Sequence, residues 1–256
     1  MSTPPWSRPW SPAWAQGATT HVGLVRAVNE DSLLVAPPVV VVADGMGGHA
    51  GGDVASRIVV EEFETLREGD FTARTGRDAI VECLVRAHSR LRDHVERHAQ
   101  EARIGHAGTT VVAALLVPGP QGATWLVANI GDSRAYVATA DALTQVTRDH
   151  SVVQQLVDAG QITAAEASVH PERHVITRAL SAVDLPEPDF FELPVARAPR
   201  LLLCSDGVSG LLDDDSMAAL AGGSGAPQEV ADSLVAAALA AGGTDNVSVV
   251  VVDVMG

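Results

Sequence analysis

The feature that most constrains the fold of this chain is the stretch Val39–Gly52, VVVVADGMGGHAGG. Four consecutive valines and an alanine form a short, wholly apolar run of mostly β-branched residues, which predicts a strand buried on both faces. The run ends at Asp44, and a glycine-rich loop follows at once. A carboxylate at the end of a buried strand is costly unless a partner compensates its charge, and glycines let the backbone bend around such a partner.

The same arrangement recurs in the C-terminal part of the chain. Leu201–Ser205 is an apolar run that ends at Asp206, and Asp245 lies just before the apolar stretch Val247–Val252. Three distant carboxylates at the ends of buried strands indicate one shared cation. Asp44, Asp206 and Asp245 offer only oxygen, and no His or Cys has the spacing of a zinc or iron site, so the pattern favours Mg²⁺ or Mn²⁺ over Zn²⁺.

Such a site has a natural substrate class. Two hard divalent cations about 4 Å apart can hold a hydroxide for in-line attack, and a phosphate ester is an electrophile suited to that geometry. The phosphate also needs a planar, permanently charged donor, which Arg26 in an acidic neighbourhood would provide. Because any single Asp-Gly pair is ordinary turn chemistry, this hypothesis depends on the joint pattern.

The composition excludes one class of function. A chain of 256 residues, 46% of them hydrophobic, can bury a substantial core, and we expect one domain. Asp and Glu outnumber Lys and Arg by 32 to 17, so the basic face of a nucleic-acid-binding protein is lacking. The acidic excess is either a solubility device or a sign that carboxylates converge on metal ions.

The location and the N-terminal segment follow from simple patterns. Cys83 and Cys204 lie in apolar stretches, which predicts two small core residues without a disulfide and favours a reducing cytoplasm. No apolar run approaches the roughly 18 residues that span a bilayer. Residues 1–17 are rich in proline and tryptophan and lack the pattern of a secretion signal. We expect an unstructured arm there, a domain over residues 18–256, and a monomer.

Hydrophobic periodicity predicts the order of helices and strands. Two amphipathic helices follow the glycine loop, one with Asp53 as its N-cap and one over residues 77–100. Strands are predicted at 19–23, 31–36, 39–43, 109–117, 123–130, 134–138, 143–146, 189–193, 200–205 and 247–254, and further helices at 151–159, 163–169 and 228–241. Because strands run consecutively instead of alternating with helices, we expect mainly antiparallel sheets and the class α+β. The polar stretch His170–Ala182 is typical of a mobile flap.

Seven short segments occur in the order found in one protein family. They are Gly23–Asp31 (GLVRAVNED), Val42–His49 (VADGMGGH), Gly108–Thr110 (GTT), Asn129–Arg134 (NIGDSR), Leu143–Ser151 (LTQVTRDHS), Cys204–Gly207 (CSDG) and Thr244–Asn246 (TDN). With these segments, residues 18–254 resemble bacterial PPM-type (type 2C) metal-dependent protein serine/threonine phosphatases. The resemblance implies a four-layer α-β-β-α sandwich, two antiparallel sheets flanked by helix pairs, with a dinuclear Mn²⁺ or Mg²⁺ centre at one edge.

The resemblance also implies ligands for the two metals. Asp44 would bridge both ions, and Gly45 would contribute its carbonyl oxygen. Asp206 and Asp245 would hold the first ion. Glu30 would act on the second ion, directly or through water.

Further roles follow from the same resemblance. Asp31 would support the second metal ion, and Arg26 would bind the substrate phosphate. Asp132, together with Asp206, is where a third, weaker ion would bind. A flap over about residues 152–180 would shape access for protein substrates.

The implied activity is hydrolysis of phosphoserine and phosphothreonine in proteins by a metal-activated water. It would reverse a bacterial serine/threonine kinase in signalling. Eukaryotic members often carry a histidine as general acid where this chain has Met46, so protonation of the leaving group would fall to a metal-bound water or to His49. We expect polar side chains in loops, without a catalytic role, for His106, His150, His170 and His174. Of these, His150 and His174 would line the cleft.

Two alternatives stay open at this point. Gly45-Met-Gly-Gly-His-Ala50 also fits the GxGxxA pattern of dinucleotide-binding proteins, with the acidic residues Glu61, Glu62 and Glu64 downstream. The second alternative is a pseudophosphatase that only binds phosphoproteins, although such a protein would typically lack a metal ligand and none is missing here. A haloacid-dehalogenase-type phosphatase is excluded, because it needs Asp-x-Asp where this chain has Asp44-Gly-Met.

Overall fold

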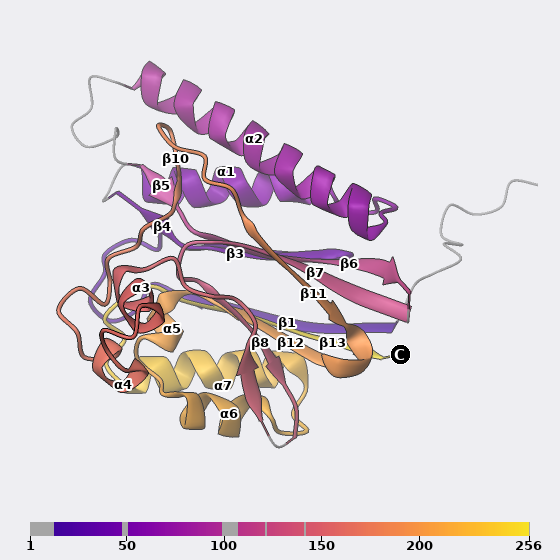
Figure 1. Ribbon diagram of the computed structural model, residues 1–256, viewed down its shortest axis with the longest axis vertical. Helices are drawn as coiled ribbons and strands as arrows, with labels where there is room; N and C mark the ends of the chain where they lie inside the picture. Colours follow the sequence, from indigo (N-terminus) through magenta and orange to yellow (C-terminus); the bar gives the residue numbers. More distant parts are fainter. Residues whose placement is uncertain (1–12, 48–50, 99–106, 121, 141, 256) are drawn as a thin grey trace, which may run out of the picture.

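Two antiparallel five-stranded sheets form the centre of the protein (Figure 1). The computed structural model describes residues 13–47, 51–98, 107–120, 122–140 and 142–255. One sheet has the order β1 (Ala13–His21), β13 (Val247–Met255), β12 (Arg200–Cys204), β8 (Arg134–Ala138) and β9 (Leu143–Gln145). The other has the order β11 (Asp189–Pro194), β7 (Gly122–Ile130), β6 (Val111–Gly119), β3 (Val39–Ala43) and β2 (Ser32–Ala36).

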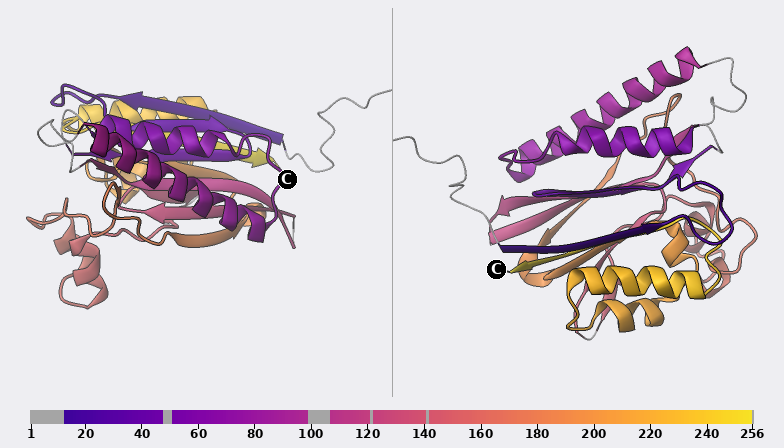
Figure 2. Two further views of the ribbon diagram at one scale, coloured as in Figure 1. Left: turned by 90° about the horizontal axis from the view of Figure 1, so that it is seen from above. Right: turned by 180° about the vertical axis from the view of Figure 1, so that it is seen from behind.

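Helix pairs cover the outer faces of both sheets, as Figures 1 and 2 show. α1 (Gly52–Glu64) and α2 (Ala73–Arg97) lie on the sheet that contains β3. α6 (Asp214–Ala221) and α7 (Pro227–Ala240) lie on the sheet that contains β13. The four-layer α-β-β-α sandwich and the α+β class are therefore confirmed.

Small elements complete the fold outside these layers. β4 (Gly45–Met46), β5 (Gly108–Thr109) and β10 (Leu180–Ser181) form a short third sheet. α3 (Val152–Asp158) and α4 (Ala164–Ala167) belong to the flap, α5 (Asp206–Ser209) follows β12, and a 3₁₀ turn covers Val195–Arg197. Among the described residues, no helix is long and apolar enough to cross a membrane.

The apolar run of β3 is explained by its place between two cores. Alternate side chains of a strand point to opposite faces, so Val39 and Val41 pack against the helix layer, whereas Val40 and Val42 pack between the two sheets. Strand β13 behaves in the same way, because it faces the other sheet on one side and α7 on the other. A strand with both faces buried needs apolar residues at every position, which is why these strands do not alternate.

Three expectations about element boundaries were wrong. The segment Ala13–Gly17, predicted to be part of an unstructured arm, pairs with β13 and begins β1. Asp53 is not the N-cap of α1, which begins at Gly52 after Gly51. α2 begins at Ala73 because Thr72 forms a capping box there.

The tryptophan of this early strand explains why β1 extends so far toward the N-terminus. Trp14 lies edge-on to Trp125 of β7, with ring centroids 5.3 Å apart, and packs against the core between the sheets. Trp125 itself is fully buried. Trp14 is thus part of the folded domain and not of an unstructured arm, whereas residues 1–12 lie outside the described residues.

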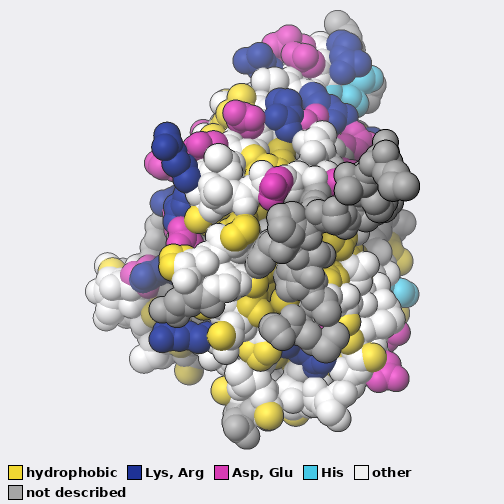
Figure 3. All heavy atoms as spheres, turned by 90° about the vertical axis from the view of Figure 1, so that its right-hand side faces the viewer, with side chains coloured by type: hydrophobic (Ala, Val, Ile, Leu, Met, Phe, Trp, Pro, Cys, Tyr) yellow, Lys and Arg dark blue, Asp and Glu magenta, His cyan; other side chains and the backbone are white. Residues whose placement is uncertain are grey.

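Charged side chains of both signs gather over the helix layer at the top of Figure 3. Arg86 and Arg90 of α2 each approach a carboxylate oxygen of Glu62 on α1 to 2.7 Å. Glu62 is largely buried, so these two ion pairs are less screened than surface pairs and join the two helices.

Replacing Trp14 with alanine tests the packing of β1. We expect Trp14→Ala to lower the free energy of unfolding by about 2 kcal/mol, because the change removes a half-buried ring and an edge-on aromatic pair. Urea denaturation of both proteins measures the difference. Val85→Ala, on the exposed side of α2, is the matched control and should change stability by less than about 0.5 kcal/mol. Equal effects of the two changes would contradict this account of β1.

Candidate metal centre

The strand pairing brings the predicted carboxylates to one end of the sandwich. Strands β12 and β13 are antiparallel, so the end of β12 lies beside the start of β13. Asp206 follows β12 and Asp245 precedes β13, which brings these two acids to the same end of the sheet. In the other sheet, β3 and β7 both pair with β6 and end at the same edge, just before Asp44 and Asp132 respectively. Distant segments therefore supply acids to one place.

The backbone around Asp44 is held by hydrogen bonds from the neighbouring strand. The carbonyl of Asp44 accepts from the Thr110 amide and from the Thr109 hydroxyl, both at 2.9 Å. The amide of Asp44 donates to Thr110 Oγ1 at 3.1 Å. These contacts fix the direction in which the chain leaves the strand.

Gly45 occupies a position that excludes any side chain. A Cβ atom there would lie 2.2 Å from the carbonyl oxygen of Gly52 and 2.4 Å from that of Glu30. The amide of Gly45 donates to the same Glu30 carbonyl at 3.2 Å. The close approach brings the Glu30 segment next to Asp44, as the predicted ligand set requires.

Asp31 joins the two sheets through its buried carboxylate. Its Oδ2 accepts a hydrogen bond of 2.8 Å from the hydroxyl of Ser205, at the end of β12. Its Oδ1 is buried and has no hydrogen-bond partner among the described residues. Burial raises the pKa of Asp31 to about 7, opposed by hydrogen bonds from Ser248 and Ser205 and reinforced by Asp206 and Asp245.

The carboxylates raise one another's proton affinity. Burial is the largest cause that lifts the pKa of Asp44 well above its ordinary value, and the charges of Asp31, Asp206, Asp132 and Asp245 add to it. The pKa of Asp132 rises to about 8, first through burial and then through the charge of Asp206. Bringing so many acids together favours any cation that can replace their protons.

Arg26 lies at the rim of this cluster, on the loop between β1 and β2. Its Nη2 donates to Asp245 Oδ2 at 2.7 Å, and about half of its side chain is exposed. Burial alone would lower the pKa of Arg26, but the bond to Asp245 and the charges of Asp245, Glu30 and Asp206 raise it. A cation at this place can serve an anion that enters from solvent.

The donor set suits a hard divalent cation bound partly through water. The described residues contain no group of three or more His, Cys, Asp or Glu side chains that encloses a metal position by itself. Mg²⁺ and similar ions keep several waters and need few direct carboxylates, so an open cluster of acids fits them better than a closed cage would. The buried, unpartnered Oδ1 of Asp31 and the all-oxygen donors support the same fit.

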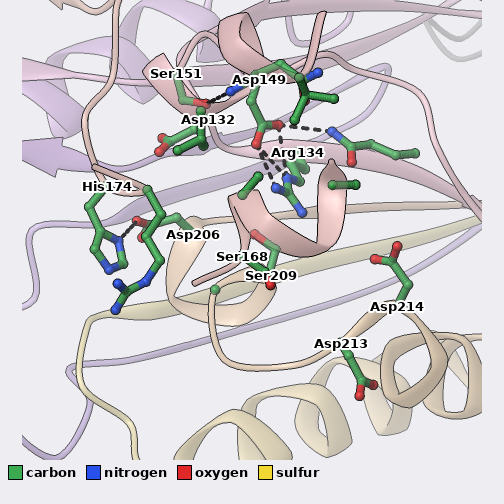
Figure 4. A pocket seen from close by; sticks show the side chains of 18 of the residues that line it. Asp132, Arg134, Asp149, Ser151, Ser168, His174, Asp206, Ser209, Asp213 and Asp214 are labelled. Atoms are coloured by element: carbon green, nitrogen blue, oxygen red, sulfur yellow. Dashed lines mark hydrogen bonds and ion pairs between the residues drawn. The ribbon is translucent and has the colours of Figure 1, made fainter. Parts of the chain in front are cut away.

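A cavity of about 570 Å³ extends from the carboxylates under the flap (Figure 4). Asp132 and Asp206 line one end, and Asp213 and Asp214 lie at the other. His174 of the flap points at Asp206, with Nδ1 3.9 Å from Oδ2, and this interaction is the main cause that raises its pKa. The prediction that His174 lines the cleft is confirmed.

An ion pair near Asp132 was not predicted from the sequence. The guanidinium of Arg134 binds both carboxylate oxygens of Asp149, at 2.7 to 3.0 Å, and Asp149 also accepts from Gln145. Both Arg134 and Asp149 lie in segments that the resemblance had marked, but a short motif does not show which of its side chains pair.

The histidine expectations had mixed outcomes. His150 was expected at the cleft and is instead buried behind the Asp132 turn, with its side chain 6% exposed. His49 lies outside the described residues.

Comparisons with known proteins agree with this geometry. Residues 25–241 match the family described as Protein phosphatase 2C. Serine/threonine protein phosphatase PstP of Mycobacterium tuberculosis is 40% identical over 247 residues, which cover 93% of this chain, but the chain spans only 44% of that relative's length. Serine/threonine phosphatase stp of Listeria innocua is 33% identical over 240 residues, covering 91% of this chain and 93% of the relative.

Solved structures show the same fold. The crystal structure of Mycobacterium tuberculosis PstP/Ppp superposes with a TM-score of 0.83 at 36% identity, covering 95% of this chain and 99% of that one. A structure of the PstP catalytic domain in complex with two manganese ions has a TM-score of 0.79, with the same identity and coverage. Stp1 from Staphylococcus aureus has a TM-score of 0.86 at 30% identity and covers 96% of this chain and 97% of its own. On sequence and structure together, the chain belongs to the protein phosphatase 2C family.

Proposed function

We propose that this chain hydrolyses phosphoserine and phosphothreonine monoesters in proteins, with divalent metal ions as cofactors. The observation that carries the proposal is the convergence of five carboxylates at one end of the sandwich, those of Asp31, Asp44, Asp132, Asp206 and Asp245. Family membership and the relative with two bound manganese ions support it. The natural substrates would be phosphoproteins made by a serine/threonine kinase that this enzyme opposes.

The residues present fit two Mn²⁺ or Mg²⁺ ions. Asp44 would serve both ions, and Gly45 would contribute its carbonyl oxygen. Asp206 and Asp245 would hold the first ion, and Glu30 would act on the second, directly or through water. A third, weaker ion would bind at Asp132 together with Asp206, while Asp31 would orient the second site from behind.

In this mechanism the residues of the chain position the substrate phosphate and neutralise its charge. The bound ions would supply a nucleophilic water and polarise the phosphoryl group. Arg26 would turn from Asp245 to the phosphate and form a bidentate, charge-assisted contact, for which its half-exposed side chain has room. The hydrogen bonds of Thr109 and Thr110 hold Asp44 in place before substrate arrives. His174 and the flap would exclude bulk water on the other side of the site.

The fold excludes the dinucleotide-binding alternative but not the pseudophosphatase alternative. A dinucleotide fold needs parallel strands joined through a helix after the glycine loop, whereas the long strand that follows α2, β6, pairs antiparallel with β3. The fingerprint hypothesis is therefore wrong. A pseudophosphatase keeps the fold and lacks turnover, so the activity assay decides that alternative. The monomeric state and cytoplasmic location stay predictions.

The activity itself is the first test. We expect hydrolysis of p-nitrophenyl phosphate and of phosphothreonine peptides with Mn²⁺, and no hydrolysis in excess EDTA, because every proposed ligand is an oxygen that prefers hard cations. Colorimetric assays with Mn²⁺, Mg²⁺ and Zn²⁺ measure this. Full activity in chelator, or activity with zinc alone, would refute the proposal.

Two substitutions separate the roles of a ligand and of the phosphate-binding group. Asp206→Asn should weaken Mn²⁺ binding and lower kcat strongly, because a ligand charge is lost. Arg26→Ala should leave Mn²⁺ affinity nearly unchanged and cost about 2–3 kcal/mol in kcat/KM, because the bidentate charge-assisted contact with the phosphate is lost. Calorimetric titration of Mn²⁺ and steady-state kinetics measure the two effects. If Arg26→Ala loses metal as badly as Asp206→Asn, the role of Arg26 is misassigned.

The raised carboxyl pKa values predict a pH dependence. Folded, metal-free protein holds protons on Asp31 and Asp132 up to pKa values of about 7 and 8, whereas the unfolded chain releases them near 3.8. The folded state then binds more protons, so its stability is highest below about pH 4 on account of these groups and falls as the pH rises through 7 and 8.

Metal binding should displace the same protons. Calorimetric titration of Mn²⁺ at pH 6, in buffers of different ionisation enthalpy, should show net proton release that vanishes near pH 9. Heat that is independent of the buffer at pH 6 would contradict these pKa directions.

A further inference from the structure

Three large apolar side chains are exposed on the loop that carries Arg26. The exposed fraction is 65% for Leu24, 69% for Val25 and 42% for Val28. Single exposed apolar residues are ordinary on a protein surface, whereas a group of them marks a place of contact with another molecule. All three lie within two positions of Arg26 in the sequence, so the group flanks the proposed phosphate-binding side chain.

The backbone of this loop is fixed at both ends. The side-chain amide of Asn246 donates to the Val22 carbonyl at 2.9 Å and to the Val28 carbonyl at 3.0 Å. The amide of Glu30 donates to Asn246 Oδ1 at 2.8 Å. One side chain thus closes the loop, and the exposure of its apolar residues is a fixed feature of the fold.

The first half of the loop packs against the segment that carries Asp245. The amide of Leu24 donates to the Gly243 carbonyl at 2.7 Å. Gly23 has a φ of +84°, and a Cβ atom there would lie 2.2 Å from the carbonyl oxygen of Asp245. A Cβ atom on Gly243 would meet Leu24 Cγ at 2.9 Å, so the Leu24 side chain lies against this segment. The apolar group therefore has a constant position relative to Asp245, a proposed metal ligand.

A protein substrate that places its phosphate at Arg26 brings its neighbouring residues to this group. Consecutive Cα atoms are about 3.8 Å apart, so the Cα atoms of Leu24, Val25 and Val28 lie within about 8 Å of that of Arg26. An extended chain advances about 3.3 Å per residue, so the residues one and two positions from a phosphoserine span a similar distance. A small phosphate ester has no such residues.

The chemistry of the loop selects the kind of neighbour. A polar residue beside the phosphoserine would lose water without gaining a hydrogen bond from valine or leucine side chains. An apolar residue would gain from burial against them. Because the loop is already held in place, the contact orders little further structure and most of this gain is kept.

We propose that Leu24, Val25 and Val28 form a docking surface for apolar residues next to the phosphoserine or phosphothreonine of a protein substrate. The inference rests on the proposed function, because the phosphate is what brings the substrate to Arg26. The surface selects among phosphoproteins and takes no part in the hydrolysis itself. Its occupant is the substrate segment one or two positions from the phosphorylated residue.

Two phosphothreonine peptides of equal charge test this preference. One carries leucine and valine on the two sides of the phosphothreonine, and the other carries asparagine and threonine, which have nearly the same shapes. With Mn²⁺, kcat/KM should be about tenfold higher for the apolar peptide, as expected for a small difference in apolar contact. The ratio of the two values is the readout, because any effect on metal binding or on Arg26 is common to both peptides.

Polar substitutions of the same shape on the loop should remove the preference. In the double variant Leu24→Asn, Val25→Thr we expect the ratio to fall below about threefold. Val183→Thr is the matched control and should keep the wild-type ratio. Val183 is 86% exposed, in a turn whose Ser181 carbonyl contacts His88 of α2.

A wild-type ratio near one, or a tenfold ratio that survives in the double variant, would overturn the proposal. If the double variant does not fold, Val28→Thr replaces it in the same assay.

Photo-cross-linking locates the contact without turnover. A phosphothreonine peptide with benzoylphenylalanine in place of the neighbouring leucine is irradiated with the protein and Mn²⁺, and the adducts are mapped by mass spectrometry. Adducts should form on residues 22–28, and the apolar peptide should suppress them more than the polar peptide does. Adducts confined to other parts of the chain would refute the docking surface.

The outcomes separate this inference from the proposed function and from self-association. Adducts on residues 22–28 without hydrolysis of any phosphate ester would refute the proposed function and leave the docking surface in place. Hydrolysis of both peptides at equal rates would do the opposite. If the surface instead joins two copies of this chain, sedimentation should show a wild-type dimer that the double variant loses, and this result would overturn the proposal.

Discussion

The burial of several carboxylates beside one another at one end of the sandwich is the constraint on which this structure depends. Burial makes the largest contribution to the cost of ionising Asp44, and the charges of Asp31, Asp206, Asp132 and Asp245 add to that cost. Isolated, such a cluster lowers its charge by taking up protons, which is why the pKa values rise toward neutrality. Divalent cations offer a larger compensation. The cluster therefore links folding, protonation and metal binding in one equilibrium.

The frame that withstands this repulsion is apolar and is buried on both sides. The valines of β3 pack into two different cores, and those of β13 do the same. Polar bonds then tie the two sheets together at the acidic end. Ser205 donates to Asp31, and Thr110 and Ser133 share a hydrogen bond of 2.7 Å. Packing fixes the sheets as units, and these few bonds fix their edges relative to each other.

Much of this was predictable because it depends on local patterns. Uninterrupted valines predict a strand with two buried faces, and the consecutive strands predict antiparallel sheets, which the structure confirms. Two features were not predictable in this way. The start of β1 depends on Trp14 meeting Trp125, which lies more than one hundred positions away in the sequence. The burial of His150 was the second feature that could not be predicted, because a histidine in a polar segment gives no sign of the partners that surround it.

The contrast between core and flap indicates how one fold can combine a rigid acid cluster with a movable cover. Asp44 leaves a strand whose residues are all buried, so its position has little freedom. The flap helices bury none of their residues, so the cover can move without disturbing the core. Between the two lies Asp132, which belongs to the core through β7 but takes its backbone direction from His150 and the flap base. Of the acids at this end of the sandwich, Asp132 is thus the one whose backbone is held by a residue that also contacts the flap base.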